Sequence, residues 1–137
     1  MEMVAERVVT LRKSRQREEV MRVLMSTTSH PTADWIYQQV RRNIPSVSLG
    51  TIYRNLRILR DAGQILELNF GGSLGRFDGR IDEHDHFFCE NCGCIRDIER
   101  PVDMDVASLY IRQDEGRVYS CRVELLGVCN NCSHGCS

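Results

Sequence analysis

The sequence lacks a long apolar run and any segment of strongly biased composition. No stretch of its 137 residues approaches the roughly 20 apolar residues that a membrane-spanning helix needs. Hydrophobic residues make up 42% and charged residues 27%, a balance that excludes disorder, a collagen-like repeat or a coiled coil as the overall plan. The first residues also lack a basic region followed by an apolar stretch, so we expect no secretory signal, no membrane partner and a cytoplasmic location.

The first 70 residues lack cysteine, and the whole chain has a net charge of only −1. The charges are unevenly divided: residues 1–70 contain 11 Lys and Arg against 7 Asp and Glu, whereas residues 71–137 contain 7 against 12. All seven cysteines lie in the acidic half. In a reducing cytosol, such cysteines are more typical of metal ligands or reactive thiols than of disulfides. The basic half is compatible with nucleic-acid contact and equally with solvated helix faces.

Apolar spacing in the first half predicts three short helices. The first has a stripe at Val20, Val23 and Leu24, extended upstream by Val8 and Leu11. A second helix begins at Pro31 or Thr32, and a third begins after the cap residue Ser48 and ends at Gly63. Residues 65–70 and 76–78 flank a Gly71-Gly72 turn, as in a hairpin. Three helices followed by a two-stranded wing predict a winged helix-turn-helix.

The third predicted helix has an apolar face and a polar face. Leu49, Ile52, Leu56 and Leu59 form the apolar face. The opposite face holds Gly50, Arg54, Arg57 and Asp61, with Thr51 and Tyr53 at its flanks. Arginine binds phosphate or guanine, and Thr and Tyr contact thymine or the backbone. The pattern fits a DNA-recognition helix, and it also fits a solvated helix with two arginines.

The second half has a mixed pattern of strands and one helix. We expect a strand over 94–98, a helix over 104–111 and a strand over 119–128, with a glycine-rich hinge over 71–82. The fold class is therefore α+β. The expected organisation is an N-terminal winged-helix domain over 1–79, joined by a hinge to a small α/β dimerisation domain over 80–137.

Four cysteines form two C-x2-C motifs, Cys89 with Cys92 and Cys129 with Cys132. Each motif places two thiolates on a tight turn, and two such turns complete a tetrahedral site typical of structural Zn²⁺. A disulfide relay or an iron–sulfur cluster is the alternative. We expect the other cysteines, Cys94, Cys121 and Cys136, to be free thiols, and His134 to belong to the tail.

A second set of donors surrounds His84-Asp85-His86. In a strand, residues two apart share a face, so both imidazoles can bind one ion. Asp78 and Asp97 lie nearby in the predicted topology. Imidazole with carboxylate suits Fe²⁺, Mn²⁺ or Zn²⁺. Two surface histidines beside a zinc motif would give the same pattern.

Together these features resemble the ferric uptake regulator (Fur) family of bacterial metal-dependent repressors. The resemblance covers roughly residues 10–133, and its matching stretches are 12–17, 30–37, 48–56, 75–78, 84–93 and 127–132. It is nearest to the peroxide-sensing branch, whose members have aspartate at the positions of both Asp78 and Asp97. Asn55 and the segment 30–34 also look typical of that branch, whereas Arg54 is more typical of iron sensors.

The resemblance implies two metal sites. Cys89, Cys92, Cys129 and Cys132 match the structural zinc site of the dimerisation domain. A regulatory Fe(II) or Mn(II) site matches five residues that come from both halves of the chain: His30, Asp78, His84, His86 and Asp97. In the peroxide-sensing branch, iron reacts with hydrogen peroxide and a ligand histidine is oxidised, so His30 and His84 are the expected sites of oxidation.

The resemblance also implies a homodimer that binds a palindromic operator in double-stranded DNA. The expected DNA contacts lie before the first helix and on the third: Arg12, Arg15, Arg17, Ser48, Gly50, Thr51, Tyr53, Arg54 and Arg57. An iron-responsive repressor is the main alternative, followed by a zinc sensor. A hydrolytic metalloenzyme or a purely structural zinc adaptor fits less well, and we expect no enzymatic activity, because a short chain with a winged helix leaves little room for a substrate pocket.

Overall fold

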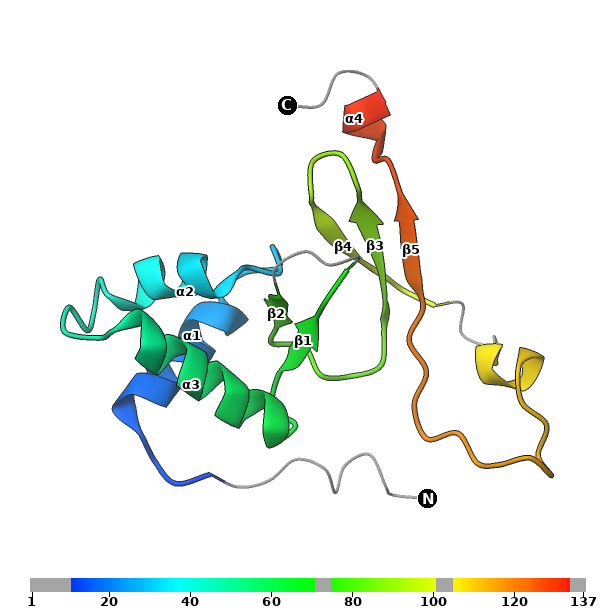
Figure 1. The fold of residues 1–137 in the computed structure, drawn as a ribbon, viewed down its shortest axis with the longest axis horizontal. Helices are drawn as coiled ribbons and strands as arrows, with labels where there is room; N and C mark the ends of the chain where they lie inside the picture. Colours follow the sequence, from blue (N-terminus) through cyan, green and yellow to red (C-terminus); the bar gives the residue numbers. More distant parts are fainter. Residues whose placement is uncertain (1–10, 71–74, 101–104, 134–137) are drawn as a thin grey trace. The chain divides into compact units, whose positions relative to one another are not determined.

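The computed structural model describes residues 11–70, 75–100 and 105–133, and the chain divides into two compact units (Figure 1). The first unit ends at Ile81 and the second begins at Asp82. Helices and short strands make up both units, in agreement with the predicted α+β class. Among the described helices, none has the length and apolar character needed to span a membrane.

The first unit contains three helices and a hairpin. The helices are α1 (Arg15–Met25), α2 (Ala33–Val40) and α3 (Leu49–Asp61). Each begins after an N-cap residue, Ser14, Thr32 or Ser48, whose side-chain hydroxyl accepts a hydrogen bond from a backbone N–H in the first turn of the helix. Strands β1 (Leu66–Leu68) and β2 (Arg76–Asp78) pair antiparallel, so the predicted helices and hairpin are confirmed.

The core of the first unit joins all three helices. Each helix contributes buried apolar residues, including Leu24 on α1, Ile36 on α2 and Leu56 on α3, whereas Leu49 of the predicted apolar face of α3 is half-buried. Leu11 packs against this core, whereas Val8 lies outside the described residues. Because α3 buries one face, its opposite face is exposed at Tyr53, Arg54 and Arg57.

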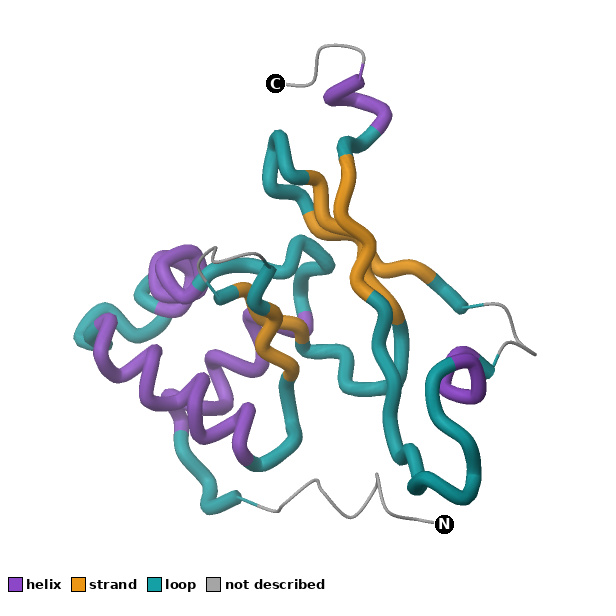
Figure 2. Tube along the Cα trace, turned by 45° about the vertical axis from the view of Figure 1, so that its right-hand side comes forward, coloured by secondary structure: helices purple, strands orange, loops and turns teal. Residues whose placement is uncertain are grey.

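The second unit is built on a three-stranded sheet in the order β4-β3-β5, in which the strands lie side by side (Figure 2). The central strand β3 (Asp85–Cys89) pairs antiparallel with β4 (Ile95–Ile98) and parallel with β5 (Glu124–Gly127). A short helix, α4 (Asn130–Ser133), follows β5. The carboxyl ends of β3 and β5 therefore lie at the same edge of the sheet.

Two predicted elements of the second unit are wrong in extent. The helix expected over 104–111 is a short 3-10 helix, η2 (Val106–Leu109), without a buried residue, and Met104 lies outside the described residues. A helix this short needs tertiary packing to persist, and Leu109 and Tyr110 are 76% and 83% exposed. The strand expected over 119–128 is formed only at 124–127, and just before it the N–H groups of Cys121 and Val123 donate to the side-chain carboxylates of Glu83 and Asp85.

Candidate metal centres and DNA-contact surface

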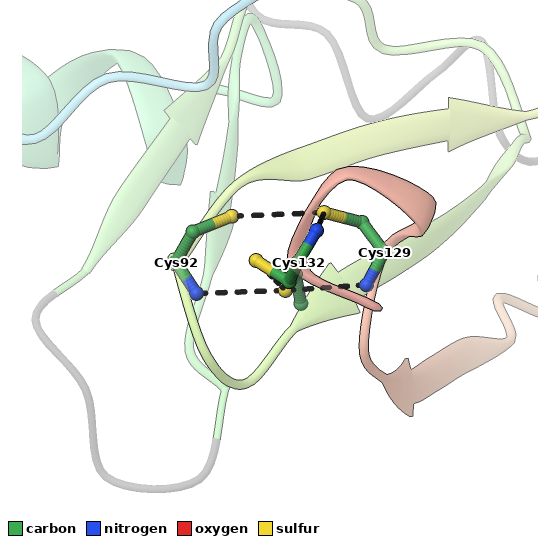
Figure 3. A group of neighbouring side chains, drawn as sticks. Cys92, Cys129 and Cys132 are labelled. Carbon is green, nitrogen blue, oxygen red and sulfur yellow. Dashed lines mark hydrogen bonds between the residues drawn. The ribbon is translucent and has the colours of Figure 1, made fainter. Parts of the chain in front are cut away.

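The structure brings the four cysteines of the two C-x2-C motifs together in the second unit. Cys89 ends β3, Cys92 lies in the turn before β4, and Cys129 and Cys132 lie at α4. Their four sulfur atoms lie within 4.8 Å of one another. Sγ of Cys89 is 3.5 Å from Sγ of Cys132, and Sγ of Cys92 is 3.9 Å from Sγ of Cys129. Figure 3 shows Cys92, Cys129 and Cys132 gathered at this point.

The backbone around these thiols favours their charged form. The N–H groups of Cys129 and Cys92 point at Sγ of Cys89 at 3.3 and 3.5 Å. These donors lower the pKa of the Cys89 thiol to about 6, since a hydrogen bond to a thiolate stabilises it. The N–H of Cys94 likewise lowers the pKa of Cys92. A cluster of four thiols fits Zn²⁺, which binds thiolates tetrahedrally.

Cys94 lies next to this cluster but differs from it chemically. Burial raises the pKa of its thiol to about 12, with a further contribution from Cys92. A neutral thiol is a poor metal ligand, so Cys94 is distinct from the four donors. Cys121 is also a free, half-buried cysteine, whereas Cys136 and His134 lie outside the described residues.

The second unit also brings two buried histidines onto one carboxylate. His84 and His86 are 1% and 0% exposed. Asp97 lies opposite His86 in the β3–β4 register, and its Oδ1 is 3.2 Å from Nε2 of His84 and 3.3 Å from Nε2 of His86. Nδ1 of His84 lies 2.7 Å from the carbonyl of Asp82. A proton on Nδ1 would be held there, leaving Nε2 as the ligand atom.

The first unit contains a histidine–carboxylate pair of the same chemistry. Nε2 of His30 lies 3.3 Å from Oδ2 of Asp78, and both residues are buried. Asp78 ends β2, and His30 lies in the loop before α2 with φ of 54°. That left-handed backbone is unusual for a residue with a side chain. Arg76 donates to the carbonyl oxygens of His30 and Ser29, which holds the loop in place.

The helical spacing of the first unit gives no indication that His30 belongs to a ligand set. Its backbone conformation depends on β2, which lies more than 40 residues further along the chain. A histidine directly before the Pro31-Thr32 helix start looks like an ordinary loop residue. Only the family resemblance singled it out.

The predicted DNA contacts separate into two groups. Tyr53, Arg54 and Arg57 project from the exposed face of α3, and Gly50 and Arg12 are exposed as well. The other predicted contacts make bonds within the unit. Ser48 caps α3 at Thr51, Arg15 donates to the carbonyl of Asn43, and Arg17 donates to Oδ1 of Asn55 and to the carbonyl of Arg12.

Asn55 is a residue that the spacing of α3 did not single out. It is 1% exposed, although it lies on a helix with an outer face of arginines. Its Oδ1 accepts from Nη1 of Arg17 at 3.3 Å. The bond joins α3 to the beginning of α1, so Arg17 helps to hold the segment around Arg12 beside α3.

Replacement of Cys92 by serine tests the thiolate cluster. We expect Cys92→Ser to abolish stoichiometric zinc and to lower the thermal stability of the second unit, because structural zinc contributes directly to folding. Metal analysis of the purified protein and thermal unfolding measure both effects. Cys121→Ser is the matched control and should keep its zinc; zinc retained in Cys92→Ser would contradict the assignment.

Comparison with known proteins places the chain in a family. The model of the ferric uptake regulator family matches residues 9–126. The peroxide-responsive repressor PerR of Staphylococcus epidermidis is 41% identical over 132 residues, which cover 93% of this chain and 88% of the relative.

Two solved structures of similar proteins resemble the fold. The Helicobacter pylori ferric uptake regulator Fur matches with a TM-score of 0.78 and 27% identity, over 90% of this chain and 83% of the other. The Campylobacter jejuni peroxide stress regulator matches with a TM-score of 0.66 and 29% identity, over 82% and 84%. Because the family model spans most of the residues and a relative exceeds 40% identity over nearly the whole length, this chain belongs to the ferric uptake regulator family.

Proposed function

We propose that this chain is a metal-dependent repressor of transcription that releases DNA in response to hydrogen peroxide. The observation that best supports this proposal is that the buried imidazoles of His84 and His86 converge on the half-buried carboxylate of Asp97. The identity to a peroxide-responsive repressor supports the same function. A histidine-rich set of this kind suits Fe²⁺ or Mn²⁺, and it is separate from the four thiols that suit Zn²⁺.

The regulatory ion in this proposal takes ligands from both units. The five donors are His30, Asp78, His84, His86 and Asp97. One ion bound to side chains of two units stabilises whichever arrangement lets all of them bind together. The four cysteines would instead hold zinc permanently, since their site draws on the second unit alone.

Peroxide sensing follows from the ligand chemistry. A bound ferrous ion would promote cleavage of the O–O bond of hydrogen peroxide beside its ligands, so that one peroxide oxygen would be added to an imidazole carbon and the other would leave as water. His30 and His84 are the proposed targets, one in each unit. Oxidation alters the imidazole and weakens its bond to the ion, so the units lose their shared constraint and the DNA-binding form becomes less populated.

The first unit acts in this proposal as a winged helix-turn-helix. Helix α3 would enter the major groove, where Arg54 and Arg57 reach guanine or phosphate and Tyr53 contacts the backbone or a thymine methyl group. Gly50, at the start of α3, would allow close approach of the DNA backbone. Other contacts would come from Ser48 and Thr51 at the cap of α3 and from Arg12, Arg15 and Arg17 around the start of α1.

The second unit is the proposed dimerisation domain. Its outer strand β5 exposes Leu125 and Leu126, which are 47% and 57% exposed, and Val128 follows at 52%. Large apolar side chains gathered on one strand favour contact with another protein. A second copy of the chain would pair two α3 helices about a two-fold axis, and such a dimer suits a palindromic operator.

Mass spectrometry of the metal-loaded protein tests the peroxide reaction. After anaerobic loading with Fe(II) and exposure to a small excess of hydrogen peroxide, we expect one added oxygen on the peptide containing His30 or His84. The Mn(II)-loaded control should remain unmodified. Unmodified histidines in the iron sample would favour an iron-responsive repressor, and oxidation confined to cysteines would favour a thiol sensor.

Removal of one imidazole tests the separation of the two metal sites. We expect His84→Ala to abolish Mn(II)-dependent DNA binding and to retain zinc, because the thiol cluster does not include His84. Electrophoretic mobility shifts and metal analysis measure the two properties. His134→Ala, which alters neither donor set, should behave as the parent protein. Loss of zinc from His84→Ala would show that the two sites are not independent.

The salt dependence of DNA binding tests the role of α3. We expect Arg57→Gln to weaken binding and to reduce the slope of log affinity against log salt by about 1 if the side chain contacts phosphate. Arg112→Gln is the matched control, since Arg112 lies in the second unit and is 79% exposed. Unchanged affinity of Arg57→Gln at every salt concentration would contradict the proposed orientation of α3.

A further inference from the structure

In the second unit, the buried carboxylate of Asp85 forms an ion pair with the half-buried Arg100. Asp85 separates His84 from His86 in the sequence and is only 6% exposed. Its carboxylate accepts hydrogen bonds from Nε of Arg100 at 2.9 Å and from Nη2 of the same side chain. It also accepts the backbone N–H of Val123 at 2.8 Å. The carboxylate therefore binds two distant parts of the chain at once.

The guanidinium of Arg100 extends this network to a third segment. Nη2 donates to the carbonyl of Cys121 at 2.9 Å, and Nη1 lies 3.6 Å from Oε1 of Glu83. Glu83 in turn accepts the backbone N–H of Cys121 at 2.7 Å. One planar cation thus connects the start of β3, the segment after β4 and the segment before β5. A flexible ammonium could not reproduce this fork of donors.

The network lies at the start of β3, where its pairing with β4 and β5 begins. The β3–β5 ladder begins at the pair His86 with Glu124, and the β3–β4 ladder begins at Asp85 with Ile98. His84 precedes both ladders. The residues on either side of it, Glu83 and Asp85, make the side-chain bonds of the network. Side-chain bonds to Asp85 and Glu83 therefore hold the backbone that presents the His84 imidazole to Asp97.

Stability alone is a weak explanation for this arrangement. Burying a charged pair loses hydration energy that its mutual attraction barely offsets, so such pairs contribute more to defined geometry than to folding free energy. We propose that Arg100 is a positioning residue for the regulatory metal: through Asp85 it holds His84 and His86 with their Nε2 atoms facing Asp97. This inference rests on the proposed function, in which those three side chains bind the ion.

Replacement of Arg100 separates positioning from simple electrostatics. A positive charge near a cation site weakens cation binding, so its removal should strengthen binding if charge alone matters. If Arg100 instead positions the ligands, its removal should weaken cation binding. We expect Arg100→Gln to weaken Mn(II) binding about tenfold or more, the range typical of residues that orient metal ligands. Arg100→Lys, which keeps the charge but not the fork, should bind with intermediate affinity.

The experiment is a Mn(II) titration of the zinc-containing protein, accompanied by the visible absorption spectrum of the Co(II)-loaded form. The Co(II) bands report ligand geometry, which a merely stabilising brace would leave unchanged in the folded protein. Arg96→Gln is the charge-matched control on β4, where Arg96 lies over the Phe87 ring at 5.8 Å. It should retain both affinity and spectrum.

The outcomes are distinguishable. Weaker Mn(II) binding with altered Co(II) bands and full zinc content supports the inference. Unchanged or tighter binding in Arg100→Gln overturns it. If that variant fails to fold, as shown by lost zinc, Arg100→Lys decides by the same two readouts. Absence of a second metal in the unaltered protein would instead contradict the proposed function itself.

Discussion

The pairing of β3 with both of its neighbours is the constraint on which the second unit depends. This five-residue strand has β4 on one side and β5 on the other. It ends at Cys89, which the parallel pairing brings beside Cys129. At its beginning, the antiparallel pairing brings His86 opposite Asp97. Because a slip of one residue would turn every side chain to the other face, the register of β3 determines both donor sets.

The two donor sets differ in the chemistry that a metal would experience. Thiolates favour zinc and similar soft or borderline ions, whereas imidazole with carboxylate suits Fe²⁺, Mn²⁺ or Zn²⁺. The four thiols all belong to the second unit, and backbone N–H groups favour the ionised form of Cys89 and Cys92. A zinc ion in such a site would stabilise the second unit, and a small sheet with an exposed outer strand needs this stabilisation. In the proposed function, the regulatory ion must instead bind and leave, and the imidazole–carboxylate donors are assigned to it.

Helix α3 combines a packing role with an exposed arginine surface. Leu56 and Ile52 anchor it in the core, whereas Arg54 and Arg57 remain exposed. The buried Asn55 adds a polar connection to Arg17 and so to the segment around Arg12. The consequence is a surface in which some arginines are available to DNA and others hold the helices together, although all of them look alike in the sequence.

The sequence by itself determined the features that depend on near neighbours. Helical spacing predicted α1, α2 and α3, Ser48 was predicted as the cap of α3, and each C-x2-C motif predicted two thiolates on one turn, because each pattern acts within a few residues. Only the tertiary structure decided features that depend on distant partners. Arg76 donates to the carbonyl of His30, whose backbone is left-handed, and Glu83 and Asp85 accept the N–H groups of the segment just before β5. Likewise, Arg100 acquires its role from Asp85, 15 residues away, since side-chain contacts across a fold leave no periodic trace in the sequence.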